Sequence, residues 1–230
     1  MFASFDFDVI RRSLGYLFFD GMTFTLTLTG LSALGGLIFG TLIALMRLSG
    51  FTLLGRIAGL YVDLMRSLPL VLVIFWFYFL VPYIGQWVTG SSRPIRVGAF
   101  TSSLVTFIMF EAAYFSEIMR AGIQSISSGQ PAAAQALGLT YSQTMRYVVL
   151  PQAFRNMLPV LLTQTIVLFQ DTSLVYVLSI PDFLGAASKV AQRDGRLVEM
   201  YLFAAAVYFV ISCAASFGVR RLQTRISIIR

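Results

Sequence analysis

The side chains that most often carry out catalysis are scarce in this chain. Its 230 residues include no His, one Cys (Cys213) and one Lys (Lys189). These counts exclude a histidine acid–base relay, a zinc site, a disulfide framework and a P-loop. The chemistry that remains belongs to carboxylate, amide and hydroxyl groups, several of which lie inside apolar stretches. We therefore expect no enzymatic activity, no metal site and no cofactor bound by this chain.

Glu111 and Asp171 are the two acidic residues placed deepest within apolar stretches. An ionisable group in the middle of a membrane helix is costly and commonly marks a transport path. One interpretation is that both acids line such a path. The other is that both face the helix bundle, held by hydroxyl and backbone groups or protonated in place. The polar residues that would accompany them on a path are Thr163, Gln170, Thr172 and Ser173.

These side chains must be positioned by membrane helices. Hydrophobic residues make up 57% of the chain and charged residues only 12%, against roughly 25% charged in a soluble domain. About 20 mostly apolar residues are needed to cross a bilayer. The sequence predicts an all-α, multi-pass membrane protein with five transmembrane helices in one domain over 20–220. The predicted spans are 21–46, 57–82, 97–119, 157–178 and 198–218.

The distribution of basic residues predicts the orientation. Five spans place the termini on opposite sides, and Lys and Arg favour the cytoplasmic loops. Placing the N-terminus outside gives ten of the 17 basic residues to the cytoplasm, and acids partly balance the other seven. We therefore expect a periplasmic N-terminal segment (1–19), which is not a cleaved signal peptide, and a basic cytoplasmic tail (221–230). The basic residues serve loops and the membrane surface, and no nucleic-acid partner is expected.

One cytoplasmic loop, 120–156, is long enough to be functional in its own right. Its centre predicts a short helix, because Pro131 stands near a helix start and a run of strong helix formers follows. Gly138 comes where a left-handed C-cap is needed. The residues of the predicted helix and its cap are Ala132, Ala133, Ala134, Gln135, Ala136, Leu137 and Gly138.

A second helix is predicted in the same loop. Thr140 and Gln143 fit a capping box, and the helix should run to Leu150 and end at Pro151. The small side chains of the first helix leave a narrow surface that could enter a groove on a partner protein. An ordinary interfacial helix pair, packed on the bundle or on lipid, is the alternative.

The phrase GQPAAAQALG at 129–138, followed after eleven residues by LPQA at 150–153, resembles the EAA loop of ABC importer permeases. Three more phrases resemble the polar amino acid permeases of that class. DLMRSLPL at 63–70 is similar to E-x-x-R-G-T-P-L, EAAYFSEIMRAG at 111–122 to A-Y-x-A-E-I-x-R-G-G, and QDTSL at 170–174 to K-D-T-S-L. The four motifs occur in the same order as in the family, and their residues are most similar to those of glutamate/aspartate import permeases of Gram-negative bacteria.

The resemblance implies a type I ABC importer permease fold in the cell inner membrane. It implies a coupling role for the loop helix and for Leu150 and Pro151 against an ATP-hydrolysing subunit. The expected partners are two ATPase subunits, which would use the ATP, a second permease chain (identical or homologous), a periplasmic amino-acid-binding protein and membrane lipid. An importer of another polar amino acid, such as glutamine or asparagine, and a secondary transporter are the alternatives.

The sequence departs from the family pattern at two positions. Ala132 stands where the EAA phrase has its Glu, so an acidic contact to the ATPase would be absent or supplied elsewhere. Gln170 stands where the K-D-T-S-L phrase has its Lys, which puts in doubt a role for that position in binding the substrate's carboxylate.

Two acid–base pairs at i, i+3 spacing, Asp63 with Arg66 and Glu117 with Arg120, lie at expected helix ends. They could be local salt bridges or parts of a gate-side network that couples the loop to the spans. A G-x-x-x-G pair, Gly36 and Gly40, predicts close packing of the first span on a neighbour, in this chain or in another.

Overall fold

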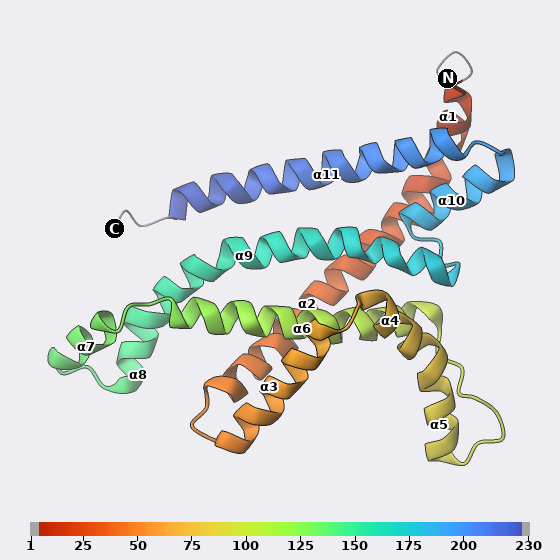
Figure 1. Ribbon diagram of the computed structural model, residues 1–230. Coiled ribbons are helices and arrows are strands. Elements are labelled where there is room, and N and C mark those ends of the chain that lie inside the picture. Colours follow the sequence, from red (N-terminus) through yellow and green to blue (C-terminus); the bar gives the residue numbers. More distant parts are fainter. Residues whose placement is uncertain (1–4, 227–230) are drawn as a thin grey trace. The chain divides into compact units, whose positions relative to one another are not determined.

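The computed structural model describes residues 5–226, and every regular element in that range is a helix (Figure 1). Five helical segments are long and apolar enough to cross a membrane, which confirms the predicted all-α class and the number of spans. They are Phe7–Leu48, Leu70–Thr89, Ala99–Gln124, Tyr141–Leu178 and Leu197–Ile226.

The α-helices in chain order are α1 (Phe7–Gly15), α2 (Thr23–Leu48), α3 (Thr52–Ser67), α4 (Leu70–Phe75), α5 (Val81–Thr89), α6 (Ala99–Gln124), α7 (Gly129–Ala136), α8 (Tyr141–Thr144), α9 (Leu150–Asp171), α10 (Phe183–Asp194) and α11 (Leu197–Ile226). Wider π-helical segments join several of them: η2 (Tyr16–Met22), η3 (Trp76–Leu80) and η4 (Met145–Val149). A 3₁₀ segment, η5 (Thr172–Leu178), continues α9.

The chain forms two compact units. The first unit comprises Met1–Leu34, Leu68–Ile108 and Ile166–Ala215, and the second comprises Gly35–Ser67, Met109–Thr165 and Ser216–Arg230. Four of the five boundaries fall within α2, α6, α9 and α11, and the fifth follows the end of α3. Each unit has its own buried core and is described separately.

In the first unit, α10 lies along η2 (Figure 1). The contact is close because Gly21 has no side chain: a Cβ there would lie 3.0 Å from Ala186 Cβ. Leu17, Phe183 and Met200 are fully buried around this contact. A second buried cluster of the same unit contains Leu28, Ile74, Phe107, Leu168, Val175 and Ile180.

In the second unit, the later part of α2 packs closely on α6. A Cβ on Gly36 would lie 2.7 Å from Glu111 Cβ, and one on Gly40 would lie 2.9 Å from Phe115 Cβ. The close packing expected of the G-x-x-x-G pair is therefore present, and its neighbour is a helix of the same chain. Ala44, Phe115, Met119 and Leu161 form the buried cluster beside it.

The second span differs from the prediction of 57–82. The helix α3 ends at Ser67, and the apolar helical segment is Leu70–Thr89. Pro69 is the cause, because the residue before a proline disfavours the helical conformation. Pro69 itself is extended (φ −61°, ψ 129°), and its carbonyl accepts the N–H groups of Leu72 and Val73 at the start of α4.

The close approach of α2 and α6 gives a testable difference between two glycines of one helix. Gly40→Val should lower stability by about 1–3 kcal/mol, because the added methyl groups overpack the contact with Phe115. Gly30→Val is the matched control, since nothing lies within 4 Å of a Cβ at Gly30. The measurement is the midpoint temperature of thermal aggregation in mild detergent. Equal midpoints for both variants would contradict the packing role.

Candidate functional site

The loop helix α7 ends as its sequence predicts. Gly138 has φ +85°, a left-handed conformation. Its N–H donates to the Gln135 carbonyl at 2.9 Å, and the Leu139 N–H donates to the Ala134 carbonyl at 3.1 Å. This pair of hydrogen bonds is a Schellman motif, which satisfies carbonyls that the end of a helix leaves open. The chain therefore turns sharply after α7 at a position suited to glycine.

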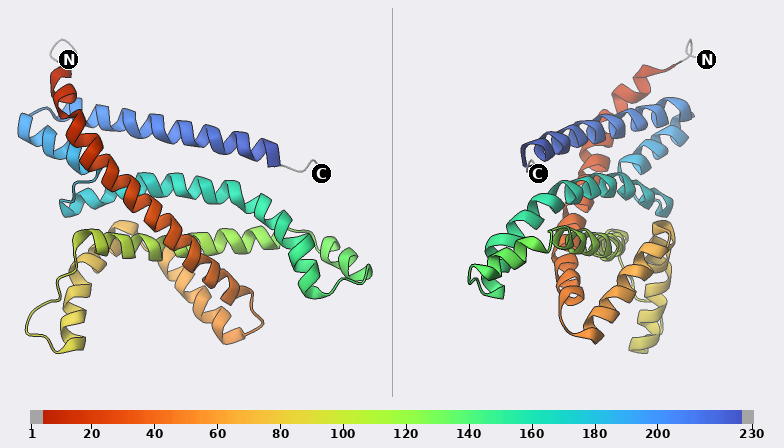
Figure 2. Two further views of the ribbon diagram at one scale, coloured as in Figure 1. Left: turned by 180° about the vertical axis from the view of Figure 1, so that it is seen from behind. Right: turned by 60° about the vertical axis from the view of Figure 1, so that its left-hand side comes forward.

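The next helix begins with the predicted capping box. Gln143 N–H donates to Thr140 Oγ1 at 3.4 Å, and Thr140 N–H donates to Gln143 Oε1 at 2.9 Å. The helices α7 and α8 form a short hairpin (Figure 2). Within α7, Ala134 is buried. The small helix is thus held by its own hairpin, and its other alanines are exposed.

Large apolar side chains are exposed around this hairpin. Leu137 is 81% exposed, Tyr141 73% and Tyr147 63%. We call these three the loop patch. Exposed apolar groups of this size commonly mark a contact with another protein or with a membrane. Sequence reasoning included Leu137 but missed the tyrosines, although aromatic residues in an otherwise polar segment are a signal for such a contact.

The prediction that Pro151 ends the second helix is wrong. Instead α8, η4 and α9 continue as one helical segment through Leu150 and Pro151. The π-helical segment η4 ends at Val149, two residues before the proline, which has no N–H to donate. Gln152 Nε2 donates to the Val148 carbonyl at 2.8 Å and so satisfies an acceptor at the disrupted turn. The same amide lies 3.5 Å from Gln130 Oε1 of α7, linking the loop helix to α9.

Glu117 forms the centre of an ionic cluster in the second unit. The predicted pair with Arg120 is present, and Arg120 Nε donates to Glu117 Oε2 at 3.2 Å. Arg47 at the end of α2 pairs with the same carboxylate. All three side chains are largely shielded from solvent, with exposures of 17–27%. Sequence reasoning missed Arg47, because its partner is 70 residues away.

The other predicted pair is not formed. Among residues 5–226, no ion pair joins Asp63 to Arg66. The Arg66 guanidinium lies over the Tyr114 ring instead, 5.5 Å from its centroid. A cation–π contact of this kind ties α3 to α6 within the second unit.

The residues expected on a translocation path fall into both units. In the second unit, Glu111 is 1% exposed and accepts a hydrogen bond from Gln164 Nε2 at 3.3 Å. Thr163 donates its hydroxyl to the Pro159 carbonyl of its own helix at 2.9 Å. Buried Glu111 therefore contacts an amide side chain of α9, whereas the sequence analysis named hydroxyl and backbone groups as its partners.

In the first unit, four of the expected residues follow one another where α9 passes into η5. Gln170 Nε2 donates to Ser212 Oγ at 3.0 Å, and Thr172 Oγ1 donates to the Phe169 carbonyl at 2.7 Å. Asp171 is half-buried between them, and Ser173 follows. The change from α-helix to 3₁₀ helix at Thr172 turns successive polar side chains in different directions.

Asp182 is a buried acid that sequence reasoning counted only as a loop charge. It is fully buried and caps α10: its carboxylate accepts the N–H groups of Leu184 and Gly185, both at 3.0 Å. The Phe183 N–H donates to Thr25 Oγ1 at 3.0 Å. Burial raises the pKa of Asp182 to about 7, although the backbone N–H groups oppose this shift. An Asp directly before an apolar helix was the available signal for the cap.

With this geometry in view, comparison with known proteins decides the family. A model of the family described as the inner membrane component of binding-protein-dependent transport systems matches residues 36–228. The chain belongs to this family. It is a multi-pass inner-membrane permease of an ABC importer, in which ATP hydrolysis resides in a separate subunit.

Individual relatives are similar in sequence to this chain along nearly its whole length. The glutamate/aspartate import permease protein GltK of Escherichia coli O157:H7 is 54% identical over 221 residues, covering 96% of this chain and 98% of GltK. The probable glutamine permease GlnP of Bacillus subtilis (strain 168) is 34% identical, covering 90% and 92%. The glutamine permease GlnP of E. coli K12 is 32% identical, covering 98% and 99%.

Solved structures confirm the permease fold. A chain of an amino acid ABC transporter crystallised with histidines superimposes with a TM-score of 0.86 at 32% identity, covering 96% of this chain and 98% of that one. A chain of the MetNI methionine transporter gives a TM-score of 0.74 at 18% identity, which shows the shared fold.

Asp182 generates a prediction about pH. An unfolded Asp has a pKa of about 3.9, so the folded protein binds more protons between that pH and about 7. Stability should therefore fall as the pH rises through this range, by at most about 4 kcal/mol at 1.36 kcal/mol per pKa unit. Asp182→Asn should flatten this dependence in thermal unfolding measured from pH 4.5 to 8. Asp8→Asn, at an exposed acid, is the control, and an unchanged slope in Asp182→Asn would contradict the assignment.

Proposed function

We propose that this permease imports glutamate and aspartate across the inner membrane. The observation that carries the proposal is the 54% identity with GltK over nearly the full length of both chains. The glutamine permeases share only 32–34% with this chain over similar lengths. A permease for glutamine or asparagine is the alternative that this difference in identity disfavours.

The proposed complex contains two ATPase subunits, a second permease chain and a periplasmic binding protein that delivers the amino acid. This chain would bind no ATP. Its N-terminus would be periplasmic and its C-terminus cytoplasmic, as the arginine distribution predicts. That orientation places α7 and the loop patch at the cytoplasmic surface, where an ATPase subunit can reach them.

We infer that α7 couples ATP hydrolysis to the permease. The Ala132 position lacks the acid of the EAA phrase, so the contact would depend on apolar area, and the loop patch supplies it. The capping motif at Gly138 holds α7 in a fixed relation to α8, and the Gln130–Gln152 contact links it to α9. Movement of α7 would therefore be passed to a membrane helix.

The Glu117 cluster offers a second connection within this unit. It ties the end of α2 to the last turns of α6, which lead directly into the loop. Motion of the loop would act on both helices together and shift the equilibrium between outward-open and inward-open states. Our candidates for the path that opens are Glu111, Thr163, Gln170, Asp171, Thr172 and Ser173.

Uptake by reconstituted vesicles tests the proposal. Proteoliposomes would contain the permease, its partner permease and ATPase, with the binding protein outside and ATP inside. Labelled glutamate should accumulate only with ATP, and excess aspartate should compete while glutamine should not. Uptake that needs neither ATP nor the other subunits would overturn the proposed ATP-driven import. Competition by glutamine alone would overturn the proposed substrate specificity.

In the same assay, Gly138→Val should reduce uptake at least tenfold, because a branched residue is strained at φ +85°. Gly90→Val is a matched control: Gly90 has φ +65° and open space around it, but lies at the end of α5. Full uptake in Gly138→Val, or an equal loss in both variants, would contradict the coupling role of the loop.

A further inference from the structure

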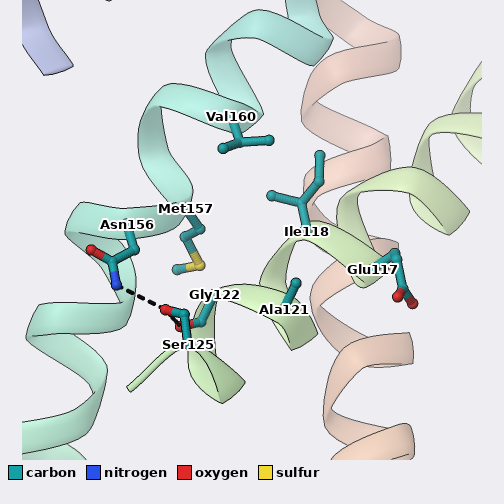
Figure 3. A pocket seen from close by; sticks show the side chains of 8 residues that line it. All are labelled: Glu117, Ile118, Ala121, Gly122, Ser125, Asn156, Met157 and Val160. Carbon is teal, nitrogen blue, oxygen red and sulfur yellow. Dashed lines mark hydrogen bonds between the residues drawn. The ribbon is translucent and has the colours of Figure 1, made fainter. Parts of the chain in front are cut away.

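Two adjacent cavities of opposite character lie in the second unit, near the ends of α6 and α9. The first, of about 300 Å³, is lined mainly by apolar side chains, and Figure 3 shows them between the two helices. The second, of about 290 Å³, is lined by polar and basic side chains together with Pro159 and Ile226. Each is near the lower end of the roughly 300–1,000 Å³ typical of ligand sites.

The two cavities share a wall. Ser125 and Asn156 line both, and Asn156 Nδ2 donates to Ser125 Oγ at 2.8 Å. Gly122 allows the helices to approach here, because a Cβ at this position would lie 2.8 Å from Met157 Cβ. A ligand that uses both cavities would therefore be polar on one side of this hydrogen bond and apolar on the other.

The charge of the polar cavity indicates an anion. Arg155 and Gln223 supply donors, and none of the described residues that line this cavity is acidic. Arg220 and Arg225 lie on the same helix as Gln223 and add positive charge to that helix end. Glu117, which lines the apolar cavity, is neutralised by Arg47 and Arg120.

We propose that the two cavities form a site for an anionic phospholipid. The phosphate would lie against Arg155 and Gln223, and an acyl chain would lie against Ile118, Met157 and Val160. Arg155 directly precedes the apolar part of α9, and Gln223 follows that of α11, so both lie at the depth of lipid headgroups. Basic pockets between membrane helices at the cytoplasmic surface characteristically bind such headgroups.

This inference rests on the proposed orientation and is independent of the transported amino acid. The test uses the full-length permease, purified in mild detergent with the subunits that accompany it. Short-chain phosphatidylglycerol is titrated in, and thermal stabilisation is recorded. Phosphatidylcholine of the same chain length and inorganic phosphate are titrated separately. Phosphatidylglycerol alone should stabilise the protein with a saturable dependence.

Two variants assign the site. Arg155→Gln should weaken the apparent affinity for phosphatidylglycerol at least fivefold, while Arg56→Gln, at an exposed arginine of α3, should leave it unchanged. Val160→Trp should also weaken it by filling the apolar cavity; Val160 is 50% exposed, so the larger ring can be tolerated.

Three results would overturn the site: equal losses in the two arginine variants, unchanged affinity in Val160→Trp, or equal stabilisation by inorganic phosphate. Glutamate uptake is measured in parallel on wild-type protein. Intact uptake without lipid binding would reject the lipid site and leave the proposed function standing.

Discussion

A lipid bilayer offers no hydrogen-bond partner to a backbone N–H or C=O group, and this constraint decides where the chain can leave the α-helical conformation. Three departures in the described residues have an identifiable compensation. The carbonyl of Pro69 accepts two N–H groups at the start of α4, and Gln152 supplies a side-chain donor beside Pro151. Asp182 does the same for the start of α10 inside a fully buried environment. The polar side chains near these breaks are thus partly structural.

The loop helix α7, which we propose as the coupling element, satisfies its own backbone in the same way. The helix α7 ends in its own capping motif and needs no partner to stay folded. It packs on α8 and η4 through the buried Ala134, and a polar contact between Gln130 and Gln152 links it to α9. The loop patch remains outside, available to another subunit. A helix whose end is capped within its own segment is suited to carrying a displacement without unfolding.

Sequence reasoning succeeded where the determining chemistry was local. Gly138 and the Thr140–Gln143 capping box were predicted because each depends on neighbours within a few residues. It failed where the outcome depended on residues distant in the sequence or on a local change of helix type. Pro69 and Pro151 are the same residue type, yet one breaks a helix and the other lies within one. The π-helical segment at 145–149 and the Gln152 side-chain donor accompany Pro151, and neither leaves a simple sequence pattern. The pairing of Arg47 with Glu117 likewise could not be predicted, because the two residues are 70 apart in the sequence and only the fold brings them together.

If α7 is the coupling helix, the hairpin of α7 and α8 meets the ATP-hydrolysing subunit. The most direct measurement is cross-linking from a single cysteine, with native Cys213 replaced by Ser. Leu137→Cys, at a side chain 81% exposed beside Gly138, should form a cross-link to the ATPase subunit in membranes. Trp87→Cys, at a side chain 85% exposed on α5, should form none. A cross-link from position 87, or none from position 137, would contradict the account.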